Sequence, residues 1–300
     1  MENQQTLASP IVFSGVGLHT GASVTLKVLP APQDTGIVFQ RIDLDNFQIE
    51  ATIKNVAHVS YATTLLKQGV LISTVEHLLS SLYIFGVDNA VIELDNLEVP
   101  ILDGSALEFV KEIRRVGLKA QKHSRKYLVI EKPIHLKERG KTISVYPANN
   151  FQISYSIDFE HPLIGKQTFE FEATPQKFAA EIAPARTFGF LHEVEELRKN
   201  GLVRGGSLEN AIVLTKTGIL NDILRFKDEF VRHKILDNIG DLSLIGYPIV
   251  GRIVAEKAGH ALHTKLVSRI LNEPKLYKTV TYNQLQEMDR QSACHAQVAE

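Results

Sequence analysis

The feature that most constrains the fold of this chain is an order of elements that occurs twice. Each half runs through strands, a helix, a glycine, another strand, a second glycine and a closing helix. The closing helices begin with Gly104-Ser105-Ala106-Leu107 and with Gly259-His260-Ala261-Leu262. We interpret this match as an internal duplication. Two similar halves predict a pseudo-twofold arrangement with the helices packed face to face, and a site between the halves would take residues from both.

Hydrophobic periodicity predicts the elements of the first half. The segment Ser73 to Phe85 has apolar side chains on one helical face, and Gly86 follows at the position of a C-terminal cap, so a helix is predicted. Gly15 and Gly17 match the first part of a dinucleotide-binding motif, but Thr20 stands where that motif has its third glycine. A strand follows instead of a helix, so this stretch indicates a hairpin turn and not a dinucleotide motif. The predicted strands of this half are 11–13, 24–28, 37–39 and 87–94, and its second helix runs from 103 to about 116.

The strongest pattern of the second half is strict alternation. Every second side chain from Phe151 to Phe159 is apolar and the others are polar, which is typical of a strand with one buried face. The polar, basic stretch from Leu118 to Arg125 is predicted to be a linker, and we place the domain boundary there, giving domains 1–122 and 123–300. The other elements predicted in this half are strands at 169–171 and 249–255 and helices at 175–182, 191–199, 229–244 and 260–270.

Composition excludes several classes of protein. The chain has 33 basic and 34 acidic residues and no long basic block, so a nucleic-acid partner has no support. No stretch approaches the roughly 18 apolar residues of a membrane span, and the segment Met1 to Pro10 lacks the apolar core of a signal peptide. Cys294 is the only cysteine, which excludes a disulfide within the chain and predicts a cytoplasmic protein. Cys294 and His295 would suit a metal, but a frayed tail is the simpler interpretation.

Two short motifs on matching helices of the two halves carry the chemistry. Glu76 and His77 lie in the first turn of one helix, and His233 and Asp237 lie on its counterpart. The i, i+4 spacing of His233 and Asp237 puts both side chains on one face of the helix, where they can bind one ion. With His77 they form a two-histidine, one-carboxylate set that leaves a position open, as in catalytic zinc sites. Glu76, beside a ligand, would then act as general base.

Each motif also has a structural interpretation. Ser73-x-x-Glu76 matches a capping box, in which Glu76 would reach back to the start of its own helix. A histidine and an aspartate four residues apart on an amphipathic helix are usually a solvated pair, and in that case no metal binds. The combination of an acid–His pair in one half with His-x-x-x-Asp in the other favours the metal site.

Three further residues are candidates for the same site. Asp241 follows Asp237 by four residues and is a helix-cap partner, a solubilising charge or a carboxylate that orients an imidazole. His260, at a helix start, would need such an anionic partner to stay protonated, and a protonated His260 can donate to a leaving amine. Thr187, in the loop from Ala185 to Phe190, would contact a developing oxyanion, unless that loop is simply a turn anchored by its two phenylalanines.

Together the motifs resemble those of the UDP-3-O-acyl-N-acetylglucosamine deacetylases, the zinc amidases of lipid A biosynthesis. The matching stretches run in order across nearly the whole chain, and jointly they are highly specific. They are Gly15 to Gly21, Ser73 to Leu78, Ile101 to Ala106, Ala185 to Phe190, Phe230 to Asp237 and Gly259 to Leu262.

The resemblance implies an α+β fold of two duplicated domains. Each domain would be a mainly antiparallel sheet with two helices, and the helices would be sandwiched between the two sheets. Inserts are implied at about 51–72 and 191–215, and the second would form an apolar passage for a fatty acyl chain; a polar tail follows residue 281. The residues that would line this passage, or form the core of the insert, are Leu191, Val194, Leu197, Leu202, Val203 and Leu208.

The resemblance also implies a role for each candidate residue. The zinc ligands would be His77, His233 and Asp237. The catalytic groups would be Glu76 as base, His260 as acid with Asp241 behind it, and Thr187 at the oxyanion. The substrate contacts would be Lys234 and Lys257 at the phosphates or sugar, Phe159 at the nucleotide base and Phe188 at the sugar or acyl region.

The expected reaction is hydrolysis of the N-acetyl group of UDP-3-O-(3-hydroxyacyl)-N-acetylglucosamine by a monomer that uses zinc. Its partner is an acylated UDP-sugar. Two rival functions share the metal motifs. A metal hydrolase for another acetylated sugar or acyl amide would differ in the apolar passage, and a binding protein with a closed metal site would show a fourth protein ligand.

Overall fold

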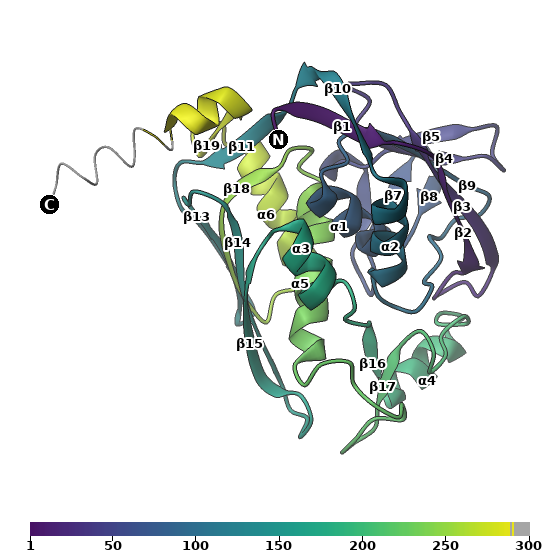
Figure 1. Cartoon of the computed structure of the whole chain (residues 1–300). Helices are drawn as coiled ribbons and strands as arrows, with labels where there is room; N and C mark the ends of the chain where they lie inside the picture. Colours follow the sequence, from purple (N-terminus) through teal and green to yellow (C-terminus); the bar gives the residue numbers. More distant parts are fainter. Residues whose placement is uncertain (289, 291–300) are drawn as a thin grey trace, which may run out of the picture.

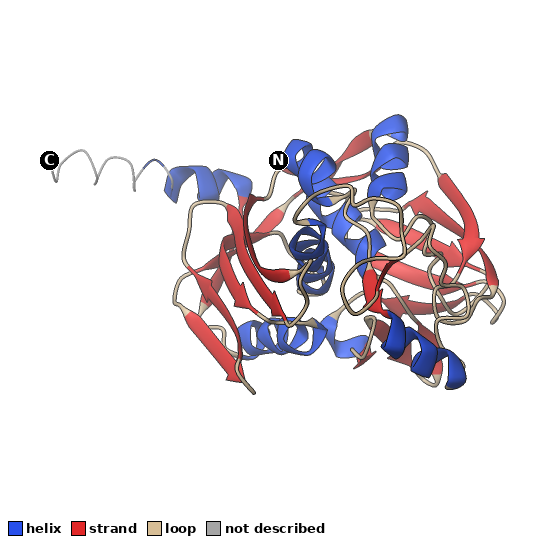
Figure 2. Cartoon of the chain, turned by 90° about the horizontal axis from the view of Figure 1, so that it is seen from below, coloured by secondary structure: helices blue, strands red, loops and turns tan. Residues whose placement is uncertain are grey.

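The computed structural model describes residues 1–288 and residue 290, and it has a layered α+β architecture. Figure 1 shows one large sheet on each side of the molecule with helices between them, and Figure 2 shows the chain turned to be seen from below. The fold class that the resemblance implies is therefore confirmed: two large, mainly antiparallel sheets enclose the helices.

The sheet of the first domain has five strands in the order β2-β3-β9-β4-β5. Its strands are β2 (Ile11–Val16), β3 (Ser23–Pro30), β4 (Ile37–Arg41), β5 (Phe47–Glu50) and β9 (Ala90–Leu94). β4 and β9 are parallel, and the other pairs are antiparallel. Alternate side chains of β3, Val24, Leu26 and Val28, are buried, because one face of the sheet packs on the helices.

The sheet of the second domain repeats this arrangement. Its central strands are β12 (Ile134–Glu138), β13 (Lys141–Tyr146), β14 (Phe151–Phe159), β15 (Gly165–Glu172) and β18 (Ile249–Glu256). They run in the order β12-β13-β18-β14-β15, with β18 antiparallel to β13 and parallel to β14. The same order and directions in both domains confirm the repeat read from the sequence. β11 (Lys126–Ile130) and β19 (Tyr277–Thr281) extend this sheet.

Two helices from each domain form the layer between the sheets. They are α1 (Glu76–Phe85), α2 (Leu107–Val116), α5 (Glu229–Ser243) and α6 (His260–Asn272). α1 packs on α5 so closely that a Cβ atom at Gly240 would lie 2.2 Å from the carbonyl oxygen of Glu76. The two helices that carry the predicted metal ligands are therefore in contact, and the glycine at position 240 permits this approach.

We expect Gly240→Ala to lower the free energy of unfolding by about 1–3 kcal/mol, the usual cost of overpacking a core. The added methyl group must push the two helices apart, because the atoms that it meets belong to the backbone of Glu76. Gly218→Ala is the matched control, since the nearest atom to a Cβ there is Thr215 Oγ1 at 3.7 Å. Urea denaturation checks the prediction, and equal stability of Gly240→Ala and the wild type would contradict it.

Three expectations from the sequence are wrong in detail. The stretch Leu118–Ser124 is not a linker but strand β10, which pairs with β1 (Asn3–Leu7); its composition suggested a linker because most of its side chains are exposed. Helix α1 begins at Glu76 and not at Ser73, because Thr74 has a left-handed φ of 60°. Helix α2 likewise begins after Gly104, whose φ is 80°. The domain boundary at residue 122 stays a prediction.

The two predicted inserts contain secondary structure of their own. The first holds η1 (Ile53–Asn55) and a small sheet of β6 (Val56–His58), β7 (Thr64–Lys67) and β8 (Val70–Ile72). The second is preceded by α3 (Pro175–Lys177), the π-helical turn η2 (Phe178–Ile182) and β16 (Phe188–Phe190), and it holds α4 (Leu191–Lys199) and β17 (Ile212–Leu214). β16 and β17 pair in parallel, so they close the second insert onto the domain.

The chain after β19 continues as a helix over residues 282–288. Its Leu285 packs with Val129 and Val250 on the second sheet, so this part of the predicted polar tail is folded. Cys294 and His295 lie outside the described residues. Every helix within the described part of the chain is too short or too polar to serve as a membrane span.

Candidate metal centre and active site

The three predicted metal ligands meet where α1 and α5 touch. His77, His233 and Asp237 are buried, and one ligand atom from each lies within 4.8 Å of the other two. The Nε2 atoms of His77 and His233 lie 3.7 and 3.4 Å from Asp237 Oδ1. Two imidazole nitrogens and a carboxylate oxygen therefore converge on one point, as the i, i+4 spacing on α5 predicts.

A backbone hydrogen bond orients His233. Its Nδ1 atom lies 3.0 Å from the carbonyl oxygen of Ala185, and since a carbonyl can only accept, Nδ1 carries the proton. The lone pair of Nε2 then faces His77 and Asp237. Burial lowers the pKa of His233 to about 4, which keeps the ring neutral. A neutral imidazole held by its second nitrogen is the form that binds metals.

Lys234 orients the carboxylate of Asp237. Its Nζ atom donates to Asp237 Oδ2 at 2.6 Å, so the other oxygen is directed toward the two histidines. Burial alone would raise the pKa of Asp237, but the charges of Lys234 and His233 and a hydrogen bond from His77 hold that pKa well below its usual value. Asp237 is therefore ionised, as a ligand must be. The role of Lys234 in substrate binding stays a prediction.

Glu76 is buried at the first position of α1, beside His77. Its Oε2 atom accepts a hydrogen bond from the backbone N–H of Thr63 at 3.1 Å. The capping-box interpretation is wrong, because the helix start has no side-chain cap and the N–H of Ser73 donates to the carbonyl of Leu97. Burial raises the pKa of Glu76, and the nearby His260 and His77 offset part of that effect. A carboxylate with a raised pKa beside a metal ligand is suited to accept a proton.

His260 is held by the anionic partner that the sequence led us to expect. Its Nδ1 atom lies 2.7 Å from Oδ2 of Asp241, and its Nε2 atom lies 3.9 Å from Oδ2 of Asp237 and so faces the predicted metal ligands. Burial lowers the pKa of His260, but the charge of Asp241 and its hydrogen bond more than compensate, and the pKa rises to about 9. The imidazole is therefore protonated at neutral pH.

Sequence reasoning missed three residues around Asp241. His263 Nδ1 lies 2.8 Å from Asp241 Oδ2, and its Nε2 atom lies 2.9 Å from the hydroxyl of Tyr155. Thr63, from the first insert, donates its hydroxyl to Asp241 Oδ1. Burial would raise the pKa of Asp241, but His260 and His263 hold it at about 2. The position of His263 one turn after His260 was a signal, whereas Thr63 belongs to no motif.

Asp241, His260 and His263 are also close enough to hold a metal. Their facing atoms, however, already form hydrogen bonds with one another at 2.7 and 2.8 Å. An anion that accepts from two imidazoles has its charge satisfied by them. We therefore interpret this group as a support for His260 and not as a second metal site.

One cavity of about 450 Å³ joins the predicted metal ligands to the predicted substrate residues. Every predicted site residue except Asp241 lines it. The rings of Phe159 and Phe188 meet edge to face with their centroids 5.9 Å apart, and Lys257 Nζ lies 2.6 Å from Asp158 Oδ2. Lys141, at the start of β13, also lines the cavity and was not predicted. It adds an ammonium group to the site.

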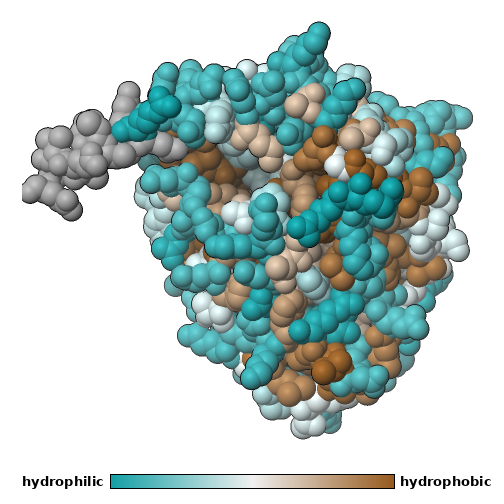
Figure 3. Space-filling view, viewed as in Figure 1, coloured by the Kyte–Doolittle hydropathy of each residue, from teal (hydrophilic) through white to brown (hydrophobic). Residues whose placement is uncertain are grey.

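The second insert contributes Phe190 and Glu193 to the cavity wall. Of the six apolar residues predicted for the acyl passage, five are half-buried outside this lining and Leu208 is exposed. Figure 3 shows apolar side chains at the lower end of the molecule, on the side of β16, β17 and α4. Exposed large apolar residues of this part of the chain include Leu208, Leu220 and Ile223. The passage stays a prediction.

The donor set fits a zinc ion. Two imidazoles and one carboxylate match the ligands of catalytic zinc sites, which keep one coordination position open. Among the residues that the structure describes, no fourth His, Cys, Asp or Glu lies within reach of all three, although Glu76 and His260 form a second close group with Asp237. Its members line the cavity, so a small molecule can reach them. This arrangement argues against a closed site in a binding protein.

Known proteins resemble this chain over nearly its whole length. Residues 4–272 match the sequence model of the UDP-3-O-acyl N-acetylglycosamine deacetylase family. The UDP-3-O-acyl-N-acetylglucosamine deacetylase of Solibacter usitatus is 50% identical over 95% of this chain and 97% of its own length. The proteins of the same name from Thermodesulfovibrio yellowstonii and Myxococcus xanthus are 48% and 50% identical, over 90% and 93% of this chain and 92% and 89% of their own lengths.

Proposed function

This chain belongs to the UDP-3-O-acyl-N-acetylglucosamine deacetylase family, and on this premise we propose that His77, His233 and Asp237 hold its catalytic metal and that the metal is zinc. The convergence of these side chains on one point carries the proposal. The reaction is the deacetylation step of lipid A biosynthesis. It removes the N-acetyl group of UDP-3-O-(3-hydroxyacyl)-N-acetylglucosamine and yields acetate and the free amino sugar.

An amide resists hydrolysis because its carbonyl is a poor electrophile and its nitrogen is a poor leaving group. When bound, zinc supplies Lewis-acid chemistry: it makes water more acidic and polarises a carbonyl oxygen. Glu76 lies beside His77 and takes the proton of the attacking water. The hydrogen bond from Thr63, which fixes the Glu76 carboxylate, and the raised pKa of Glu76 support this role.

His260 and Thr187 complete the proposed mechanism. Asp241 holds Nδ1 of His260, so Nε2 is directed toward the ligands and donates a proton to the leaving nitrogen. Thr187 lines the cavity and donates its hydroxyl to the developing oxyanion. The oxygen of water ends in acetate, and the nitrogen leaves as an amine.

The cavity lining supports an acylated UDP-sugar as substrate. Lys234 and Lys257 provide positive charge for the phosphates or sugar, and Lys141 adds to it. Phe159 offers a ring to the nucleotide base and Phe188 an apolar surface to the sugar or acyl region. We place the acyl chain toward the second insert, because Phe190 lines that end of the wall.

The substrate proposal is tested by acetate release from the acylated UDP-sugar and from UDP-N-acetylglucosamine without the acyl chain. We expect the acylated compound to react faster, because contacts with the remote acyl chain contribute binding energy in the transition state. Zinc content is measured on the same sample. Equal rates with both compounds would favour a hydrolase of other acetylated sugars.

We expect a bell-shaped dependence of kcat/KM on pH, with a basic limb near pH 9. His260 must be protonated to donate, and its pKa is raised to about 9, so the rate falls as the pH rises past that value. Glu76 must be ionised to accept a proton, and its pKa is raised, so the acidic limb lies above the ordinary carboxylate range. His260→Gln should remove the basic limb and lower the rate about 10²–10⁴-fold.

His123→Gln is the matched control for that experiment, because the His123 ring is exposed and pairs with Asp34 outside the cavity. It should leave both limbs of the profile in place. A basic limb that persists unchanged in His260→Gln would show that another group is the acid.

We further propose that the enzyme acts in the cytoplasm as a monomer. A single cysteine suits a reducing compartment. The three proposed metal ligands and the side chains of Glu76, His260 and Thr187 all come from one chain, which supports a monomer as the active form. Light scattering at the assay concentration tests the monomer, and a stable dimer would contradict it.

A further inference from the structure

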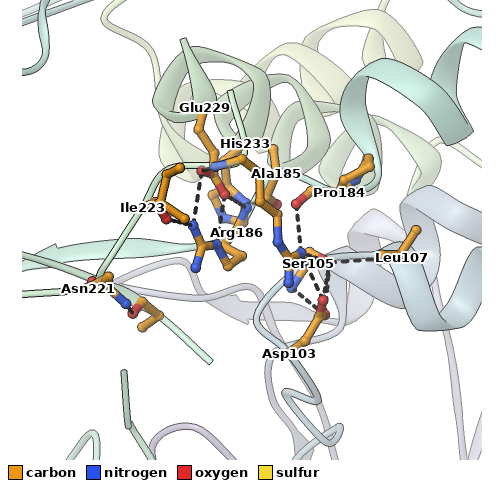
Figure 4. Close-up of polar contacts among 12 residues, drawn as sticks. Asp103, Ser105, Leu107, Pro184, Ala185, Arg186, Asn221, Ile223, Glu229 and His233 are labelled. Carbon is orange, nitrogen blue, oxygen red and sulfur yellow. Dashed lines mark hydrogen bonds and ion pairs between the residues drawn. The ribbon is translucent and has the colours of Figure 1, made fainter. Parts of the chain in front are cut away.

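A buried network of charges lies behind the metal ligand His233 (Figure 4). Glu229, the first residue of α5, has no exposed surface, and its carboxylate accepts four hydrogen bonds. Arg186 donates three of them, from its backbone N–H at 3.0 Å, from Nε at 2.9 Å and from Nη2 at 3.2 Å. The backbone N–H of Arg225 donates the fourth at 2.6 Å. The mechanism above uses none of these groups.

The network holds a short stretch of backbone, Pro184 to Thr187, by hydrogen bonds. The carbonyl of Pro184 accepts from Arg225 Nη1 at 2.9 Å, and the N–H of Thr187 donates to the carbonyl of Gly104 at 2.8 Å. Between these points lies the carbonyl of Ala185, which accepts from Nδ1 of His233. The stretch therefore carries both the partner of a metal ligand and the side chain of Thr187.

The spacing on α5 links this network to the ligand. Glu229 precedes His233 by four residues, so one helical turn separates the carboxylate from the imidazole. The same helical turn therefore carries both His233 and Glu229. Glu229 holds the backbone segment whose Ala185 carbonyl bonds to His233. In Figure 4, Glu229, Arg186 and Ala185 lie around His233 at the start of the helix.

We infer that the buried Arg186–Glu229 pair positions the metal site by holding the Ala185 carbonyl, which in turn sets the tautomer and orientation of His233. The inference rests on the proposed ligand set. A buried ion pair is weak evidence of added stability, because apolar residues of similar volume often replace one without loss. Removal of one partner, in contrast, leaves the other charge unsatisfied and frees the backbone that it held.

The test compares the zinc affinity of the full chain by competition with a chelator. Glu229→Gln should weaken zinc binding about 10- to 100-fold, the usual effect of losing a group that orients a ligand. Asp228→Asn is the matched control: it neutralises the adjacent carboxylate, whose partner Arg232, at 2.7 Å, lies outside the Pro184 to Thr187 stretch. That variant should bind zinc as the wild type does.

Cobalt(II) in place of zinc provides a second measurement, which a loss of stability alone would not change. The visible absorption of the cobalt-loaded protein reports the geometry of the ligands, and it should change in Glu229→Gln and not in Asp228→Asn. If Glu229→Gln does not fold, Arg186→Lys carries the same test, since it keeps the charge but loses the bonds from Nη2 to Glu229 and to the carbonyl of Ile223. Wild-type affinity and an unchanged spectrum in a folded variant would overturn the inference and leave the ligand set standing. A wild-type chain that binds no zinc would overturn both.

Discussion

Removal of the metal should reduce acetate release by on the order of 10³-fold or more, because Lewis-acid stabilisation of several kcal/mol is lost. Added zinc should restore the activity. Two of the three proposed ligands are held by protein contacts, His233 by the carbonyl of Ala185 and Asp237 by Lys234, so reloading should not require refolding. Elemental analysis and acetate release, before and after dialysis against a chelator, check the prediction. We expect about one zinc per chain, as a single three-ligand site implies.

Substitution of a proposed metal ligand tests the same prediction. His77→Gln should lose zinc and activity together, because His77 is the proposed ligand that α1 supplies. His123→Gln changes an exposed histidine in the same way and should lose neither. Full activity after complete removal of metal, or full zinc content in His77→Gln, would refute the proposed ligand set.

Glu76→Ala should keep zinc and lose about 10²–10⁴-fold in rate, the usual size of a general-base contribution. The side chain is buried in the cavity wall and accepts a hydrogen bond from the backbone N–H of Thr63, so the substitution removes the proposed base from a fixed position. Rates are measured on protein whose zinc content equals that of the wild type. A variant that keeps zinc but loses rate identifies a base, whereas a variant that loses zinc identifies a ligand.

Glu193→Ala is the matched control for Glu76. Glu193 also lines the cavity, but its side chain is exposed on α4, so its removal changes the charge of the cavity without removing a buried base. That variant should retain most of the activity. Nearly full activity in zinc-loaded Glu76→Ala would remove Glu76 from the mechanism.

Strong periodicity in the sequence predicted its elements well. The alternation from Phe151 to Phe159 appears as β14, and the helix expected over 229–244 appears as α5. Both patterns follow from burial of one face, a property local to the segment. The starts of α1 and α2 were not predicted, since the left-handed backbone of Thr74 and Gly104 is set by contacts that periodicity does not contain.

The strand β10 shows why composition can mislead. Its polar side chains are exposed on both sides of a two-stranded ribbon. No alternation of apolar and polar residues therefore marks it as a strand. It forms because its backbone pairs with β1, more than a hundred residues earlier in the chain. Such long-range pairing leaves no periodic trace in either segment.

The sequence by itself determined the repeated domain order, the residue types of a metal hydrolase and, through the i, i+4 spacing, the pairing of His233 with Asp237. The tertiary structure brings the predicted His77 next to them, and it alone decided that Thr63 and His263 support Asp241 and that Arg186 and Glu229 lie behind His233. The physical reason is that spacing along a helix fixes which side chains share a face, whereas contacts between α1, α5, α6 and the inserts depend on how whole layers pack. A glycine at 240 lets two helices approach closely enough for the side chains of His77, His233 and Asp237 to converge, and that closeness exists only in the folded chain.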